Sequence, residues 1–140
     1  MVAIVIVTHG RLADSLLDTA RLIVGDLPAT AAVGLEPADG PEAALRKVET
    51  AIARIDEGDG VILLVDLPGG TPCTVCMACL SRVQAEVVSG VNLTTVVKVP
   101  FVRSEAGLTL AEKAVRLASY GSRAVRVITT SACEPCCKED

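Results

Sequence analysis

Hydrophobic residues follow two patterns along this chain: continuous runs, and residues repeated at helical spacing. The continuous runs at residues 2–7 and 61–65 are rich in Val, Ile and Leu, and each predicts a strand buried on both faces. Elsewhere apolar residues recur every three or four positions, which predicts amphipathic helices. The whole pattern predicts strands at residues 2–7, 30–35, 61–65, around 86–91 and at 124–130. It predicts helices from 12 to about 25, from 41 to the glycines at 58–60, from about 71 to 82 and at 108–120, and a short helix or irregular stretch up to residue 102.

Regular alternation of strands and helices determines the expected fold. Strands separated by helices of this length pair in parallel through right-handed crossovers. We therefore predict a three-layer α/β/α sandwich with a mainly parallel sheet in the order 2-1-3-4. Gly121 is expected to close the last helix. The chain then divides into one domain at residues 1–130 and a Cys-rich tail at residues 131–140.

Composition narrows the classes of function. The 140 residues suffice for one core, which is aliphatic because the chain has one Phe, one Tyr and no Trp. A formal net charge of −4 without a Lys/Arg cluster argues against binding to nucleic acid. The first apolar run is too short to span a membrane and no basic residue precedes it, so we expect a cytoplasmic protein. The six cysteines are interpreted as reduced thiols.

The single histidine and one aspartate follow the two most apolar strands. His9 lies at the carboxyl end of the first strand, and Asp66 directly follows the third. In the order 2-1-3-4 these strands are neighbours, and ligand chemistry in open α/β sheets gathers where their carboxyl ends meet. A carboxylate that accepts a hydrogen bond from one ring nitrogen leaves the lone pair of the other nitrogen available. Position alone leaves a purely structural histidine and a helix-capping aspartate open.

A glycine-rich turn follows Asp66. Residues 67–72 read Leu-Pro-Gly-Gly-Thr-Pro, and the glycines let the backbone pass close to a ligand. Thr71 suits the N-cap of the next helix and Pro72 its first position. The segment is neither a Walker A motif nor a dinucleotide fingerprint, so nucleotide binding has no motif support. Open backbone donors for an anion are expected at Gly70, Thr71, Cys73 and Thr74.

Together these groups indicate one kind of chemistry. A transient phosphohistidine requires a nucleophilic imidazole, an orienting carboxylate and donors for the phosphoryl oxygens. It requires no metal and no cofactor. A Ser-His-Asp triad is disfavoured because Ser15 and Thr71, the candidate nucleophiles, do not lie in a GxSxG turn.

These motifs resemble those of a known family. Over residues 1–130 the chain is similar to the enzyme IIA component of the mannose family of the bacterial sugar phosphotransferase system. The resemblance implies the sandwich fold and a homodimer in which the last strand joins the partner's sheet as an antiparallel edge strand. The segments that carry it are Ile-Val-Ile-Val-Thr-His-Gly at residues 4–10, Leu-Leu-Val-Asp at 63–66, Gly-Gly-Thr-Pro at 69–72 and Gly-Val-Asn-Leu at 90–93.

The same resemblance implies residue roles and partners. His9 would be the phosphorylated residue, Asp66 its catalytic partner, and Thr71, where the family usually has serine, a phosphate-binding hydroxyl. Phospho-HPr is implied as the phosphoryl donor and a IIB component as the acceptor, with membranes involved only indirectly through transport components. The phosphate-binding candidates are Gly10, Gly69, Gly70, Thr71 and Cys73.

Some features depart from this pattern or leave alternatives open. Arg11 and Pro68 stand where some members carry tryptophan, so the rim that faces a partner differs. A related branch serves dihydroxyacetone phosphorylation, and Gly10 after the histidine favours the sugar branch. The alternative from another class is a metal- or redox-responsive regulatory module that keeps this fold and uses its cysteines.

The cysteines form two groups. Cys73, Cys76 and Cys79 recur every third residue, a spacing that places small core residues on one side of a helix. Cys73, near the start of that helix, is a candidate reactive thiol if it is exposed. The tail contains Cys133, Cys136 and Cys137, whose CxxC spacing supplies only part of a zinc site.

Overall fold

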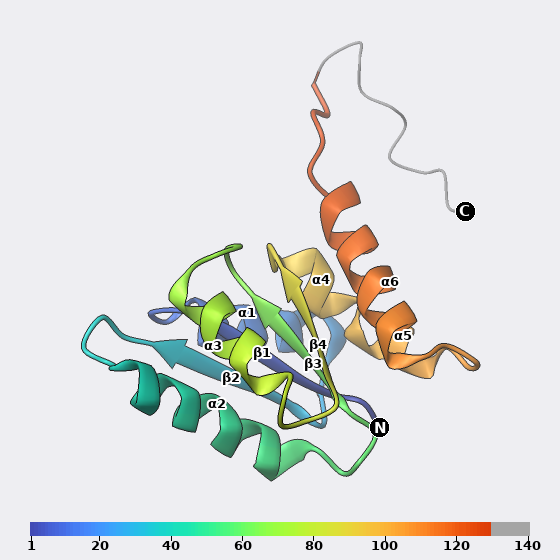
Figure 1. Ribbon diagram of the computed structural model, residues 1–140. Coiled ribbons are helices and arrows are strands. Elements are labelled where there is room, and N and C mark those ends of the chain that lie inside the picture. The colour runs from blue at the N-terminus through green and yellow to red at the C-terminus, as the bar shows by residue number, and fades with distance from the viewer. Residues whose placement is uncertain (130–140) are drawn as a thin grey trace.

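A computed structural model describes residues 1–129 of the chain. Four parallel strands form one sheet in the order β2-β1-β3-β4, as the sequence predicts (Figure 1). The two continuous apolar runs occupy the two central positions, because a central strand is covered on both faces. The strands are β1 (Ala3–His9), β2 (Thr30–Leu35), β3 (Val61–Val65) and β4 (Ala85–Ser89).

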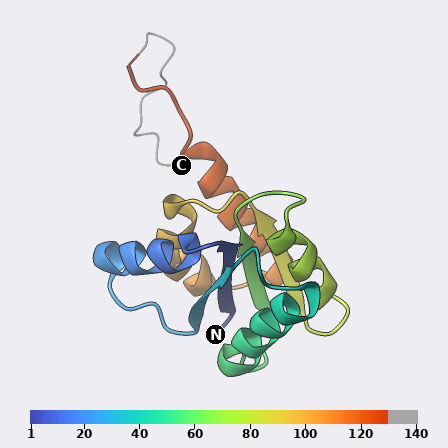
Figure 2. The same cartoon turned by 90° about the vertical axis from the view of Figure 1, so that its left-hand side faces the viewer.

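Helices cover both faces of the sheet and complete the predicted three layers, which Figure 2 shows edge-on. Within residues 1–129, none of these helices combines the length and apolar character needed to cross a membrane. One face carries α2 (Pro41–Ile55) and α3 (Thr71–Cys79). The other carries α1 (Leu12–Val24), α4 (Leu93–Val97), α5 (Val99–Ser104) and α6 (Leu110–Arg123).

Alternate residues of the central strands enter separate cores. Val5 and Leu63 pack on the side of α2 and α3, whereas Ile4 and Leu64 pack on the opposite side. Each of these four side chains is at most 1% exposed. Burial on both faces explains why these segments contain no polar alternation.

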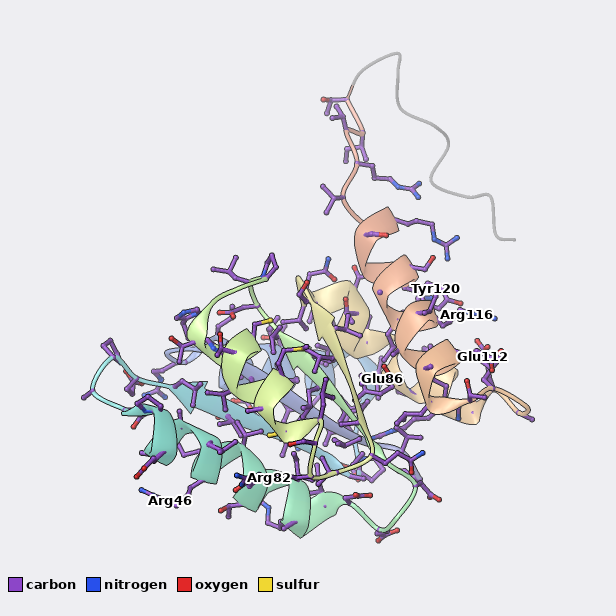
Figure 3. All side chains as sticks on the ribbon, in the orientation of Figure 1. Arg46, Arg82, Glu86, Glu112, Arg116 and Tyr120 are labelled. Carbon is purple, nitrogen blue, oxygen red and sulfur yellow. The ribbon has the colours of Figure 1, made fainter. Side chains whose placement is uncertain are left out.

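The last helix differs from the prediction at its carboxyl end. It begins with a capping box, in which Thr109 and Glu112 each bond the other's backbone N–H (Figure 3 labels Glu112). It then continues through Gly121 to Arg123, so the prediction that Gly121 ends it is wrong. A Cβ at this glycine would lie 2.3 Å from Thr95 Oγ1, so close packing against α4 requires glycine here.

Other boundaries also shift. α3 ends at Cys79 rather than at residue 82, because Leu80 N–H already donates to Met77 in a tighter turn. β4 spans Ala85–Ser89 rather than 86–91, and Gly90 turns the chain with a φ of +80°. Residues 124–129, predicted as most of the last strand, follow α6 in irregular conformation without a strand partner in the described chain. Residue 130 and the CxxC segment at residues 133–137 lie outside the described residues.

Arg103 forms hydrogen bonds to several segments at the amino-terminal edge of the sheet. Its guanidinium donates to the carbonyl oxygens of Val2, Pro28 and Ala29 at 2.9, 2.6 and 2.7 Å, and to Thr30 Oγ1 at 3.1 Å. Burial lowers the pKa of Arg103 to about 10, so the group stays charged at neutral pH. One side chain of α5 thereby joins the start of β1 to the loop that leads into β2.

Replacing this arginine should destabilise the fold. We expect Arg103→Met to lower the free energy of unfolding by about 2–4 kcal/mol, because three carbonyl groups lose a charged donor. Chemical denaturation monitored by circular dichroism measures the change. Arg46→Met, on the exposed surface of α2, is the control and should change stability by less than about 0.5 kcal/mol. Equal stability of the two variants would contradict this role for Arg103.

Candidate functional site

The structure brings His9 and Asp66 together at the carboxyl edge of the sheet. Val7 of β1 is paired with Val65 of β3, so the residues that follow these positions emerge side by side. His9 Nδ1 lies 2.8 Å from Asp66 Oδ2. The backbone N–H of His9 donates to the same oxygen at 3.0 Å. A single carboxylate oxygen therefore sets both the position and the rotation of the imidazole.

Asp66 is held as a carboxylate. Burial raises its pKa, but the hydrogen bonds from the His9 backbone and ring, with a further one from Leu67 N–H at 2.9 Å, more than offset this, and the pKa of Asp66 is lowered. An ionised carboxylate can only accept hydrogen bonds, so Nδ1 of His9 must carry the proton that it shares with Asp66. The lone pair of the neutral ring is then on Nε2.

The Nε2 edge of the imidazole faces the start of α3. A Cβ placed on Gly70 would lie 3.0 Å from His9 Cε1 and 3.6 Å from Nε2. The His9 side chain is 53% exposed, whereas that of Asp66 is only 10% exposed. Nε2 is thus accessible to a reacting group that approaches from outside, while the orienting carboxylate is shielded.

The first turn of α3 differs in detail from the predicted anion cradle. Gly70, not Thr71, is the N-cap, and Thr71 is the first helical residue. Thr74 N–H donates to Gly70 O at 3.0 Å, so it is not the open donor that was expected. The backbone N–H groups of Thr71 and Cys73 belong to the first turn, where a helix supplies no carbonyl partner. These two amides, with the N–H of the N-cap Gly70 and the exposed Thr71 side chain, are the donors available to an anion beside Nε2.

The glycine after the histidine has a structural role. Gly10 adopts a φ of +55°, and its N–H donates to Leu35 O at 2.8 Å, so this amide is not free for a phosphate. Gly34 of β2, which the sequence analysis did not single out, lies against it: a Cβ there would be 2.1 Å from Gly10 O. The sequence could have indicated this contact, because a glycine inside a strand often marks a place where another backbone segment approaches closely. Gly69 has a φ of +76° and forms the exposed turn before α3.

Thr8 is a second residue that the sequence analysis did not single out. It is fully buried, and its Oγ1 accepts a hydrogen bond from Ala13 N at 2.7 Å and donates to His9 O at 3.1 Å. The side chain thus ties the start of α1 to the backbone of the histidine. The sequence could have indicated this role, because Thr8 is a polar residue at the end of a buried apolar run.

The cysteines of α3 largely fit the predicted core packing. Cys76 and Cys79 are buried and Cys73 is half-buried. Within residues 1–129, no group of three or more His, Cys, Asp or Glu side chains is arranged to hold a metal ion. The described part of the chain therefore offers no ligand set for the metal-responsive alternative. Arg11 is exposed at the N-cap of α1, and Pro68 is exposed on the turn before α3.

The arrangement combines the groups that phosphoryl transfer through a histidine needs. Nε2 can act as the nucleophile, Asp66 can stabilise the ring when it becomes cationic, and the first-turn amides of α3 can bind the oxygens of an anion. His9 ends β1, whereas Asp66 and the α3 amides follow β3, and the order of the strands brings the two segments to one edge.

Sequence comparison finds a family model and relatives that all belong to the phosphotransferase system. The model of the EIIA-man family, described as PTS system fructose IIA component, matches residues 3–115. The PTS system mannose-specific EIIAB component of Escherichia coli strain K12 is 31% identical over 105 residues, which is 74% of this chain and 32% of the relative. The chain thus corresponds to about a third of the length of this relative.

Solved structures agree with this match. The mannose/sorbose specific IIA subunit of the phosphotransferase system from Enterococcus faecalis is 28% identical, with a TM-score of 0.81 over 95% of this chain and 98% of that one. The phosphotransferase system component EIIA from Streptococcus agalactiae has the same TM-score over 92% of this chain and 98% of that one. At 19% identity, this second likeness shows the fold alone. The chain belongs to the EIIA-man family and is a mannose-type IIA component of the phosphotransferase system.

Proposed function

We propose that this IIA component is a phosphocarrier that accepts a phosphoryl group on Nε2 of His9 and passes it on. The observation that carries the proposal is the 2.8 Å contact between His9 Nδ1 and Asp66 Oδ2, with the opposite edge of the ring beside Gly70. Phospho-HPr is the proposed donor and a IIB component the proposed acceptor, in the service of sugar uptake. Gly10 after the histidine supports sugar over dihydroxyacetone phosphorylation.

In the proposed mechanism, the Nε2 lone pair attacks the phosphorus of the donor's phosphohistidine. The new P–N bond forms as the donor's P–N bond breaks, so no proton or electron is left over. The Nδ1 proton stays in its hydrogen bond with Asp66, whose negative charge offsets the positive charge of the phosphorylated ring. The amides of Thr71 and Cys73 and the Thr71 hydroxyl bind the phosphoryl oxygens. Transfer to the acceptor is the same step in reverse order.

The names of the relatives support this assignment of partners. The E. coli relative is called an EIIAB component, a name that joins a IIA and a IIB part, and the match covers 32% of its length. We assign the IIA role to residues 1–130 and expect a IIB protein or domain as the acceptor. The reaction is proposed for the cytoplasm, with membrane components engaged only through that acceptor.

We further propose a homodimer in which residues 124–130 add an antiparallel strand to the partner's sheet. Val125, Val127 and Ile128 are 82%, 60% and 68% exposed. Residues 124–129 leave α6 and extend beyond the body of the molecule (Figure 1). Within residues 1–129, β4 pairs with β3 and with no other strand, so its outer edge is available.

Substitution at the paired residues tests the phosphocarrier function. His9→Gln should abolish phosphoryl uptake, because no nucleophile remains. Asp66→Asn should slow uptake about a hundredfold, because the amide cannot offset the charge on the ring. Incubation with enzyme I, HPr and phosphoenolpyruvate, followed by mass measurement under alkaline conditions, detects the product. Asp18→Asn, on the exposed side of α1, is the control, and phosphohistidine on a His9→Gln protein would refute the assignment.

Two N-cap glycines offer a matched test of the ring's position. Gly70→Ala should push the imidazole from its place and lower the uptake rate about tenfold or more. Gly40 is the N-cap of α2, with similar backbone angles and no atom within 4 Å of an added Cβ. Gly40→Ala should therefore have a similar small effect on stability and none on transfer. Equal rates for the two variants would show that the contact with His9 does not matter.

The dimer proposal is tested by introducing charge into the extended segment. Val125→Asp combined with Val127→Asp should yield monomers, because both side chains would be buried against the partner's sheet. Sedimentation equilibrium measures the mass in solution. Leu22→Asp, at the 87% exposed end of α1, is the control and should remain dimeric. A monomeric unmodified chain, or a double variant that stays dimeric, would rule out this interface.

A further inference from the structure

Three thiols lie in α3, the helix whose first turn faces His9. Cys73 is half-buried, whereas Cys76 and Cys79 are 0% and 1% exposed. Burial raises the pKa of the Cys76 thiol, and the neighbouring Cys79 and Cys73 raise it further, so Cys76 is a thiol rather than a thiolate at neutral pH. The phosphocarrier chemistry uses only the backbone of Cys73 and none of these side chains.

Helix geometry limits which of these thiols can be joined. Residues three apart have Cα atoms about 5 Å apart, inside the range of about 4.4–6.8 Å that disulfides span. Their Cβ atoms are about 5–6 Å apart and would have to approach to about 3.5–4.5 Å. Cys73 and Cys79 are separated by about 9 Å along the axis and cannot bond. Any disulfide within α3 therefore includes Cys76.

Accessibility selects between the two remaining pairs. Cys79 is almost fully buried, and its Sγ donates to Val75 O at 3.5 Å. Cys73 is the thiol of α3 that an oxidant in solution can reach. Cys76 lies one turn further along the helix and is placed to react with an oxidised Cys73.

We propose that a hydroperoxide oxidises Cys73 and Cys76 to a reversible disulfide, and that this bond lowers phosphoryl uptake at His9. The sulfur of Cys73 attacks the peroxide, the O–O bond breaks, and a sulfenic acid and one water form when the oxidant is hydrogen peroxide. The sulfur of Cys76 then attacks the sulfenic sulfur, the S–O bond breaks, and a second water leaves. Two thiols lose two electrons in total, which the peroxide gains, and both thiol protons leave in water.

The disulfide is expected to lower phosphoryl uptake because α3 lies beside His9 and has a low intrinsic helix propensity. This expected effect on uptake, unlike the disulfide itself, rests on the proposed function. α3 has nine residues, among them Thr, Cys and Val, which are weak helix formers. Drawing the Cβ atoms of Cys73 and Cys76 together must tighten the turn that begins at Cys73, and so move the Cys73 amide relative to that of Thr71. A displacement near 1 Å at a reacting centre can reduce a rate about a hundredfold.

The test uses the full-length chain with Cys133→Ser, Cys136→Ser and Cys137→Ser, so that the thiols of α3 alone react. The protein is treated with hydrogen peroxide, alkylated and mapped by peptide mass spectrometry, and phosphoryl uptake is measured on the same sample. We expect a bond between Cys73 and Cys76, an uptake rate about ten- to a hundredfold lower, and recovery with dithiothreitol. Cys76→Ala should form no bond and keep its rate under peroxide.

The matched control is Cys79→Ala, which removes an equally buried thiol of the same helix and should still respond to peroxide. A bond between Cys76 and Cys79, a crosslink between chains, or Cys73 stopping at sulfenic or sulfinic acid would overturn the inference. A disulfide that leaves uptake unchanged would overturn its second half. Thiol mapping does not depend on phosphoryl transfer, so failure of untreated protein to take up phosphate would count against the proposed function and not against the disulfide.

Discussion

The two hydrogen bonds from His9 to one oxygen of Asp66 are the constraint on which the rest of the site depends. A carboxylate with a side chain only 10% exposed is costly to bury unless donors surround it. Here the donors are the His9 backbone and ring and the Leu67 backbone. Two of the three belong to the main chain, one at the end of β1 and one in the turn that follows β3. The imidazole is therefore oriented before any partner arrives, and the ordering of a flexible side chain adds little to the barrier.

Elements on both sides of β1 maintain that orientation. On one side, Gly34 allows the carbonyl of Gly10 to approach β2 so closely that no side chain fits between them. On the other, Gly70 allows the start of α3 to approach the ring. Thr8 ties the same stretch of chain to the beginning of α1. The stretch that carries the histidine is thus held by close backbone approaches at Gly34 and Gly70, by Thr8, and by the Asp66 carboxylate.

The fold and the pairing of His9 with Asp66 could be predicted from the sequence, because local patterns of apolar residues determine the strands and helices. The apolar runs predict the two central strands, and the order 2-1-3-4 follows from their alternation with helices. That order brings His9 and Asp66 to one edge. The predicted roles of Gly121 and Thr71 are wrong, and at both places the glycine lies against a distant segment of the chain. Gly121 resembles a helix stop, but its lack of a side chain leaves room for Thr95 of α4 to pack against α6. Thr71 resembles an N-cap, but the N-cap is Gly70, where an added Cβ would lie 3.0 Å from His9 Cε1.

The two edges of the sheet differ in a way that bears on assembly. Beside β2 lies an open groove of about 660 Å³, whose lining includes Arg46, Lys47 and Arg54 of α2 (Figure 3 labels Arg46). Cationic side chains along an edge disfavour the approach of another strand, because pairing would bury their charge. β4, at the opposite edge, follows the helix-to-strand turn where Arg82 is bound to Glu49 at 2.5 Å. Lys47 is itself paired with Asp39 at 2.6 Å, and β4 carries Glu86, so both edges hold charge. β4 is the edge nearest to α6 and to the exposed segment that follows it.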